Sequence, residues 1–432
     1  MEFRLETAGS RRALLVSSLA VAAILSVQAV IFWVASHRVD SGRAESMARA
    51  VALVPGNGEG WDRLGRSRQW DFADPSPSEA VAYYQRAVQD DPRSAHYWMD
   101  LAGAYEDVGD DASAQKAFDR ARAVYPLSAE VMWNYGNFLL RRQDYFGAYK
   151  EIQRASGADP SFLPLAISRT WRATGDINQI LDNALPANSE AYLQAIDFFV
   201  SIQQVDLCLA VWKRLVSLGQ PIALRRTFPL METLIVGDRA EDARRVWRDA
   251  LAVSGSPQPS PDGNSSIRDG DFSADFTNGG LGWRWDAPFG AAINFDAPPP
   301  AGGKRSVRID FSGGSNLLLV TPAQFVPVEP GRAYHFHALM RTDQISTESG
   351  MRMLLNDPNH SGGVNVLTDN LTGSRPWTAV DADFATGPET HFLVVRLMRY
   401  PGRLFDNKLS GTVWIANLSL IPAGPQPGKP TP

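Results

Sequence analysis

A pattern of large and small apolar residues recurs along the first half of the chain and limits what that half can fold into. Between Ala95 and Ser128, apolar residues three or four positions apart form one stripe, Gly109-Asp110 interrupts it, and Pro126 ends a second stripe. Such spacing is helical. Neither helix buries its stripe alone, so large residues of one must fill the gaps beside small residues of the other. The stripes are Trp98, Leu101, Ala102 and Tyr105, then Ala114, Phe118 and Ala121.

The hairpin pattern repeats in step along the chain. Pro92, Pro126 and Pro160 lie 34 residues apart, and Pro55 lies 37 residues before Pro92 because the DFADPSPS turn carries an insertion. The pattern W-x2-L-[GA]-x2-Y, A-x3-F-x2-A, P resembles the tetratricopeptide repeat (TPR) family. It decays after Pro160, yet further Gly-Asp turns indicate about six hairpins over residues 43–253. The resemblance implies an all-α superhelix whose groove binds a protein partner.

Length and composition allow two or three globular domains. Of the 432 residues, 44% are hydrophobic and 21% are charged, and the net charge of −5 gives no indication of nucleic-acid binding. The single cysteine, Cys208, excludes an internal disulfide framework. Because it lies on an apolar helical stripe, we expect it to be a small core residue.

An apolar run near the N-terminus predicts a membrane anchor. Residues 13–35 carry no charge, and about 20 such residues span a bilayer as a helix. Arg11 and Arg12 precede the run, and Arg38 and Arg43 follow it, a weak bias that favours a cytoplasmic segment at 1–12. We expect one span in a cell inner membrane, with the C-terminal body on the periplasmic side. Cleavage of a signal peptide near Ala35 is the alternative.

The composition changes after residue 253. Residues 254–266 read SGSPQPSPDGNSS, which predicts a linker, and residues 423–432 form a Pro-rich tail that we expect to be disordered. Between them, short alternating segments separated by turn residues predict an all-β sandwich over residues 267–422.

The predicted sandwich resembles jelly-roll carbohydrate-binding modules. The resemblance rests on the segments IRDGDFSADFTNGGLGWRW, GRAYHFHALMRTD and GTVWIANLSL. It implies glycan binding. In that group the closing strand usually carries an Asp that helps to hold calcium, where this chain has Ala416-Asn417. We therefore expect no metal here, and no cofactor elsewhere.

Sugar binding needs aromatic faces and planar polar side chains. Trp283 is expected in the core; Trp285 shares its face if the stretch is extended, and is an exposed platform if it is a loop. His335 and His337 alternate with Phe336, so they share one strand face, either as ordinary polar residues or as zinc ligands that lack a third partner. The candidate glycan-binding residues, which could share one polar face or belong to an ordinary solvated one, are Trp285, His335, His337, Arg341, Arg352 and Arg396.

The first helices of the repeats carry the candidate groove. Met99 and Trp133 would suit an apolar peptide, or could be buried by an adjacent element. The carboxylate clamp of some TPR domains is not supported, because these helices carry no lysine. The candidate partner-binding residues are Asp62, Arg66, Met99, Glu106, Trp133, Asn137 and Arg141.

The sequence contains no catalytic constellation. Its six histidines are scattered, and it has no H-E-x-x-H, no G-x-S-x-G and no phosphate-binding glycine loop. We therefore expect a non-enzymatic, membrane-anchored scaffold, whose architecture resembles proteins of bacterial envelope or exopolysaccharide assembly. The alternative is a surface carbohydrate-binding protein in which the repeats are only a stalk.

Overall fold

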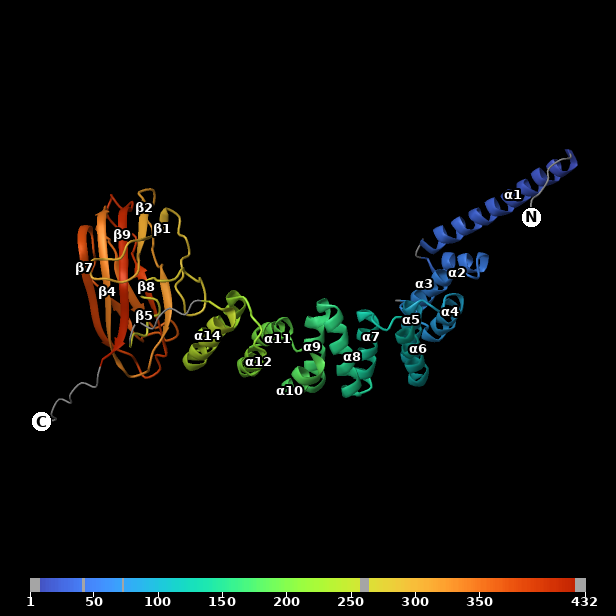
Figure 1. Ribbon diagram of the computed structural model, residues 1–432, viewed down its shortest axis with the longest axis horizontal. Coiled ribbons are helices and arrows are strands. Elements are labelled where there is room, and N and C mark those ends of the chain that lie inside the picture. The colour runs from blue at the N-terminus through green and yellow to red at the C-terminus, as the bar shows by residue number, and fades with distance from the viewer. Residues whose placement is uncertain (1–7, 41–42, 72–73, 257–263, 424–432) are drawn as a thin grey trace. The chain divides into compact units, whose positions relative to one another are not determined.

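The computed structural model describes residues 8–40, 43–71, 74–256 and 264–423, and Figure 1 labels their helices and strands. The chain divides into two compact units, Met1–Pro186 and Ala187–Pro432. The first unit is helical. The second begins with helices and ends with two antiparallel sheets. At this level the predicted order of apolar helix, helical repeats and β domain is confirmed.

The N-terminal helix α1 (Ala8–Asp40) has two parts with different surroundings. Its large apolar side chains from Leu14 to Trp33 are exposed, and its length and composition are those of a helix that can cross a membrane. Ala35 and Val39, by contrast, are buried in a cluster with Ala50 and Val54, at and just beyond α2 (Ala44–Leu53). The end of α1 is thus part of the folded helical unit.

Three regular hairpins follow α2. They comprise α3 (Gly58–Gln69) with α4 (Pro77–Asp90), α5 (Ala95–Asp107) with α6 (Asp111–Val124), and α7 (Ala129–Arg141) with α8 (Tyr145–Ala158). Local chemistry fixes their ends. Ser94, Asp110, Ser128 and Asp144 cap the helices that they precede by accepting a backbone N–H bond.

The recurring residues have a direct structural reason. The indole N–H groups of Trp61 and Trp98 donate to the carbonyls of Pro55 and Pro92, at 2.7 and 2.9 Å, so each Trp ties its helix to the preceding turn. Small residues admit large ones, as expected: a Cβ on Gly65 would lie 2.7 Å from the Tyr84 ring. Likewise, a Cβ on Gly136 would lie 2.9 Å from Ile152.

The hairpins beyond Pro160 are less regular. Helix α9 (Leu163–Thr174) follows a 3-10 turn at Pro160–Phe162, and its partner is only the short α10 (Ile177–Gln179) and a π-helical turn at Ile180–Ala184. Two complete pairs follow, α11 (Ser189–Ser201) with α12 (Val205–Ser217), and α13 (Phe228–Val236) with α14 (Ala240–Ser254). Cys208 is fully buried in α12, as predicted, and burial raises the pKa of its thiol to about 12.

The nine strands of the described chain form two antiparallel sheets. The five-stranded sheet has the order β1-β2-β9-β4-β7, and the four-stranded sheet has the order β3-β8-β5-β6. Their bounds are β1 (Ala291–Asp296), β2 (Ser306–Ser312), β3 (Ala323–Pro327), β4 (Ala333–Ile345), β5 (Arg352–Asn356), β6 (Asn365–Leu367), β7 (Gly373–Ala385), β8 (Phe392–Met398) and β9 (Ser410–Pro422).

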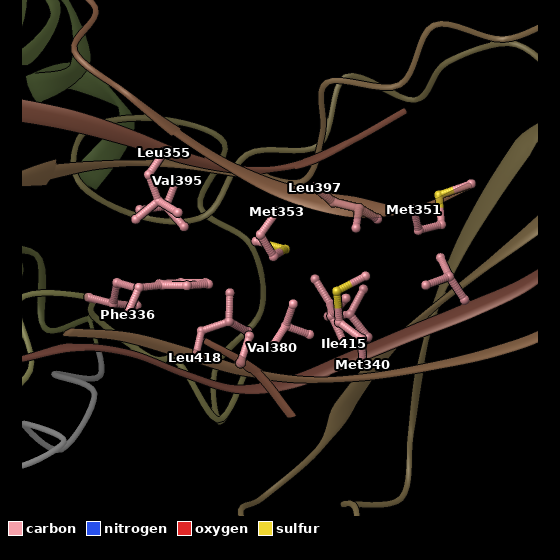
Figure 2. Close-up of a cluster of buried hydrophobic side chains, with 14 of the residues drawn as sticks. Phe336, Met340, Met351, Met353, Leu355, Val380, Val395, Leu397, Ile415 and Leu418 are labelled. Atoms are coloured by element: carbon pink, nitrogen blue, oxygen red, sulfur yellow. The ribbon is translucent and has the colours of Figure 1, made fainter. Parts of the chain in front are cut away.

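The core of the β domain lies between the two sheets. Figure 2 shows Met353, Leu355 and Leu397 from one sheet facing Phe336 and Ile415 from the other. All five are fully buried. Since the inward positions alternate along β4, the neighbours of Phe336 point to the outer face.

The predicted linker and tail lie mostly outside the described residues. Helix α14 ends at Ser254 and is capped by Gly255, which has a left-handed backbone (φ 65°), and residues 257–263 are not described. The chain rejoins the sandwich at Ser266, whose N–H donates to the Leu420 carbonyl at 2.7 Å. Of the predicted tail, only Ala423 is described.

Candidate binding surfaces

Three predicted groove residues occupy the same position in successive repeats. Asp62 and Met99 directly follow Trp61 and Trp98, and Trp133 lies 34 residues after Met99. All three are buried. The Trp133 ring stacks on Phe162 at 5.1 Å between centroids, and the Arg169 guanidinium lies 5.5 Å from the Trp133 ring centre. Of the two alternatives for Met99 and Trp133, burial by an adjacent element therefore holds, and this position does not offer an open apolar groove.

A charged cluster joins α3 to α5. The Arg66 guanidinium donates to Asp62 Oδ2 and to Asp100 Oδ2, both at 2.8 Å, and also contacts His96. Burial and then the Asp100 carboxylate raise the pKa of Asp62 to about 6, against the opposing effect of Arg66. The cluster is thus held by a cation between two carboxylates, one of them almost fully buried.

The same cluster has the donor set of a metal site. Ligand atoms of Asp62, His96 and Asp100 lie within 4.8 Å of one another. Arg66, however, bonds both carboxylates and touches the imidazole, so a guanidinium already holds the position where a cation would bind. We derive no metal centre from these residues.

The remaining groove candidates also bond across helices. Arg141 on α7 forms two hydrogen bonds, of 2.9 and 2.7 Å, with the Glu106 carboxylate on α5. The buried Asn137 accepts a bond of 2.8 Å from Arg169 on α9. Side-chain exposure is 43% for Arg66 and 55% for Arg141, so these two guanidinium groups form the accessible part of the surface.

Sequence reasoning missed His96, Asp100 and Arg169. A signal for two of them was present: His96 and Asp100 lie four residues apart on α5 and so share one face of that helix, as Asp62 and Arg66 do on α3. No comparable signal marks Arg169, because the pattern has already decayed in α9.

The outer face of the five-stranded sheet carries the two predicted histidines. His335 Nδ1 lies 2.8 Å from Asp383, His337 Nδ1 lies 2.7 Å from Asp381, and His335 Nε2 lies 3.5 Å from Asp381. The adjacent strands β4 and β7 bring the four residues together through the pairs His335–Asp383 and His337–Asp381. Phe336 points into the core, as predicted.

The third candidate on this face, Arg341, belongs to a polar network over four strands. Its guanidinium lies 4.4 Å from the centre of the Trp414 ring, and the Trp414 indole donates to Asp296 at 2.9 Å. Arg308 bridges Asp296 and Asp310 at 3.0 Å each. One aromatic ring is therefore held among charged groups on this face.

Arg352 and Arg396 do not share that face. They lie on β5 and β8 of the four-stranded sheet, so the alternative in which all three arginines line one polar sheet face is excluded. Arg396 donates to Asn356 Oδ1 at 2.6 Å, and burial lowers its pKa. Arg396 and Asn356 also line a cavity of about 430 Å³.

The two tryptophans near the start of the domain lie in an extended stretch, which is the first of the two alternatives given for Trp285. Arg284 bridges to Ala323, and Trp283 is buried with its indole donating to the Asp269 carbonyl at 3.0 Å. Trp285 packs against the same core but is only half-buried. It is therefore part of the packing, with part of its ring accessible.

No family model and no curated protein match the sequence. A solved structure described as the functional characterization of Pseudomonas aeruginosa PilF is similar at 16% identity, covering 46% of this chain and 93% of that one, with a TM-score of 0.27. YrrB, described as a TPR protein with an unusual peptide-binding site, is similar at 14% identity, covering 51% and 95%, with a TM-score of 0.26. Because both TM-scores are low, the repeats are assigned from this chain's own hairpins.

Proposed function

We propose that the protein is a non-enzymatic scaffold, anchored in a membrane by α1, that binds a protein partner through its helical repeats. The observation that carries this proposal is the pair of accessible guanidinium groups on the first helices, Arg66 on α3 and Arg141 on α7, each bonded to a carboxylate of α5. Stacked hairpins present both groups on one extended surface, and arginine is well suited to bidentate contacts with carboxylates. The covered position of Trp133 favours a polar partner segment over an apolar one.

Two adjacent arginines provide a test of this surface. Arg141 pairs with Glu106 across the first helices, whereas Arg142 pairs with Asp111 at the start of α6. In pull-downs from solubilised membranes with the full chain, we expect Arg141→Ala to lose the captured partner and Arg142→Ala to keep it. Equal capture by both variants would count against this surface.

The anchor is supported by the exposed apolar side chains of α1. Soluble proteins rarely leave so long an apolar surface uncovered, and a bilayer would cover it. The packing of Ala35 and Val39 against α2 favours a retained helix over a cleaved signal peptide. We place the body on the periplasmic side of a bacterial inner membrane, in envelope or exopolysaccharide assembly, by analogy of architecture alone.

Cysteine labelling tests this orientation. The buried Cys208 thiol, with its pKa raised to about 12, gives a low background, and Leu127 is 83% exposed. We expect Leu127→Cys to react with a membrane-impermeant maleimide in spheroplasts. Reaction only after lysis would reverse the orientation, and recovery of the chain in the soluble fraction would contradict the anchor.

A second candidate function is glycan binding by the β domain, with the repeats as a stalk. The two strand orders support a jelly-roll arrangement, the architecture of the modules that the sequence resembles. Within it, the Arg341–Trp414 pair and the half-buried Trp285 are the aromatic features that a sugar could contact. We expect the full chain to bind on a glycan array and Trp285→Ala or Trp414→Ala to weaken that binding. A silent array would leave the sandwich as a protein-docking domain.

A further inference from the structure

The last helix pair is docked on the β domain, within the unit Ala187–Pro432. The Trp247 ring of α14 lies so close to Gly280 that a Cβ there would be 2.1 Å away, and Phe228 of α13 lies as closely against Gly279. Arg284 forms an ion pair of 2.6 Å with Glu232, and Asn359 donates to the Ile235 carbonyl. Helices and sandwich therefore share one packed junction.

A cavity of about 560 Å³ lies at this junction. That volume is within the range of roughly 300–1,000 Å³ found for small-molecule sites. Trp247 and Leu251 of α14 form one apolar wall, and Leu281 and Trp283 of the β domain form another. The polar lining comes mostly from the segment before β1, and Arg305, which directly precedes β2, and Gln324 on β3 complete it.

Arg268 lines the cavity without an anionic partner. Its backbone N–H donates to Gln324 Oε1 at 3.0 Å, and its carbonyl accepts from Gln324 Nε2 at 2.8 Å, so the residue is fixed in place. In the described part of the chain no acceptor bonds its guanidinium. Burial, and then the charges of Arg244 and Arg248 on α14, lower its pKa.

Arg305 adds a second positive charge to the cavity wall. Its Nε donates to the Phe272 carbonyl at 2.6 Å and its Nη1 to Asp275 at 3.1 Å, but its Nη2 is buried with no partner among the described residues. The carboxylates that line the cavity are already engaged. Asp275 pairs with Arg305, and Asp269 accepts from the Ser273 hydroxyl and from the amides of Ser273 and Ala274.

The remaining polar groups suit a hydroxylated ligand. The hydroxyls of Ser273 and Thr277 donate to Asp269 and to the Gly279 carbonyl, so their oxygens keep lone pairs that can accept from a ligand. Guanidinium groups bind carboxylates in bidentate geometry, and apolar walls suit the C–H faces of a sugar ring. We propose that the cavity binds a sugar carboxylate, a uronate residue, through the Arg268 guanidinium, with the charge of Arg305 adding to the attraction.

The cavity is separate from the repeat surface and from the outer sheet face. Uronate binding can therefore fail while the proposed functions hold, and the proposed functions can fail while uronate binding holds. The test uses the purified full chain in detergent and isothermal titration with D-glucuronate, D-glucose and inorganic phosphate. We expect glucuronate to bind at least about tenfold more tightly than the other two, as one charge-assisted hydrogen bond would give. Equal binding of glucose, tighter binding of phosphate, or no binding of glucuronate would overturn the proposal.

Variants of Arg268 separate binding from folding. We expect Arg268→Gln to weaken glucuronate binding about tenfold or more, Arg268→Lys to restore part of it, and the surface control Arg332→Gln to leave it unchanged. Without ligand, the melting temperature of Arg268→Gln should not fall, since the substitution removes a half-buried cation whose guanidinium has no anionic partner among the described residues. A purely structural arginine would instead lower it, and wild-type affinity in Arg268→Gln would exclude the site.

Discussion

At the scale of single residues, space beside glycine decides which substitutions the repeats accept. Gly65 has the Tyr84 ring 2.7 Å from where a Cβ would lie, whereas the nearest atom to a Cβ on Gly103 is Gln69 Nε2 at 3.9 Å. Both glycines lie inside first helices, α3 and α5. The two positions thus separate packing from helix propensity.

We expect Gly65→Ala and Gly103→Ala to change stability in opposite directions. Overpacking should lower the free energy of unfolding of the helical unit by about 1–3 kcal/mol in Gly65→Ala. In Gly103→Ala, the better helix propensity of alanine should raise it by about 0.5–1 kcal/mol. Urea unfolding followed by far-UV circular dichroism measures both, and a destabilised Gly103→Ala would show that the site is less open than the structure indicates.

The contributions of two aspartates of the repeats to folding stability should change with pH in opposite directions. The folded pKa of Asp62, about 6, is above its ordinary value of 3.8, so the folded chain holds an extra proton in that window. The contribution of Asp62 to stability is therefore full below about pH 4 and is lost as the pH rises to about 6. Asp110, a helix cap, has a lowered pKa because it accepts bonds from Ser113, so its contribution is lost only in acid.

The matched variants are Asp62→Asn and Asp110→Asn. From about pH 4 to about pH 7, the stability of wild type minus that of Asp62→Asn should decrease, whereas the same difference for Asp110→Asn should increase or stay constant. Thermal melts at a series of pH values give both differences. Parallel curves for the two variants would contradict the assignment of the raised pKa to Asp62.

At the scale of elements, the sequence predicts the structure best where a single local contact explains why a residue type recurs. Trp61 and Trp98 recur because the indole of each donates to a proline carbonyl. Position 136 is a glycine because the Ile152 side chain occupies the space that a Cβ would need. The pattern fails at Ile180–Ala184, where a π-helical turn replaces a helix. It also could not assign Arg352 and Arg396 to the second sheet, since alternation fixes the face of a strand but not the sheet to which the strand belongs.

The junction of α14 with the β domain should depend on Gly280. Its backbone has φ 56°, and a Cβ would lie 2.1 Å from Trp247, whereas Gly331 has φ 65° with nothing within 4 Å. Gly331→Ala should cost only the backbone strain, about 1–3 kcal/mol. Gly280→Ala should cost more, because Trp247 must also move. Thermal melts rank the two, and equal losses would mean that the Trp247 contact contributes little.

At the scale of the whole molecule, the division into units does not follow the change from helix to strand. The boundary lies at Pro186, inside the helical array, so α11–α14 belong with the sandwich. Composition alone placed the division at the Pro/Gly/Ser segment, because a linker signal is local. The contacts that join the last helices to the sandwich, such as Glu232 with Arg284, are remote in sequence and leave no such signal.

This division predicts which elements lose protection together. Phe336 and Tyr84 are both fully buried, one in the sandwich core and one in the first hairpin, and truncating such aromatic residues costs about 3–5 kcal/mol. Under mild urea, hydrogen exchange in Phe336→Ala should accelerate in the sandwich and in α13–α14 but not in α5–α6, whereas Tyr84→Ala should accelerate it in α3–α6 only. If α13–α14 in Phe336→Ala kept wild-type protection, the helices would be stable without the sandwich, and the junction that encloses the Arg268 cavity would be a loose contact between independent domains.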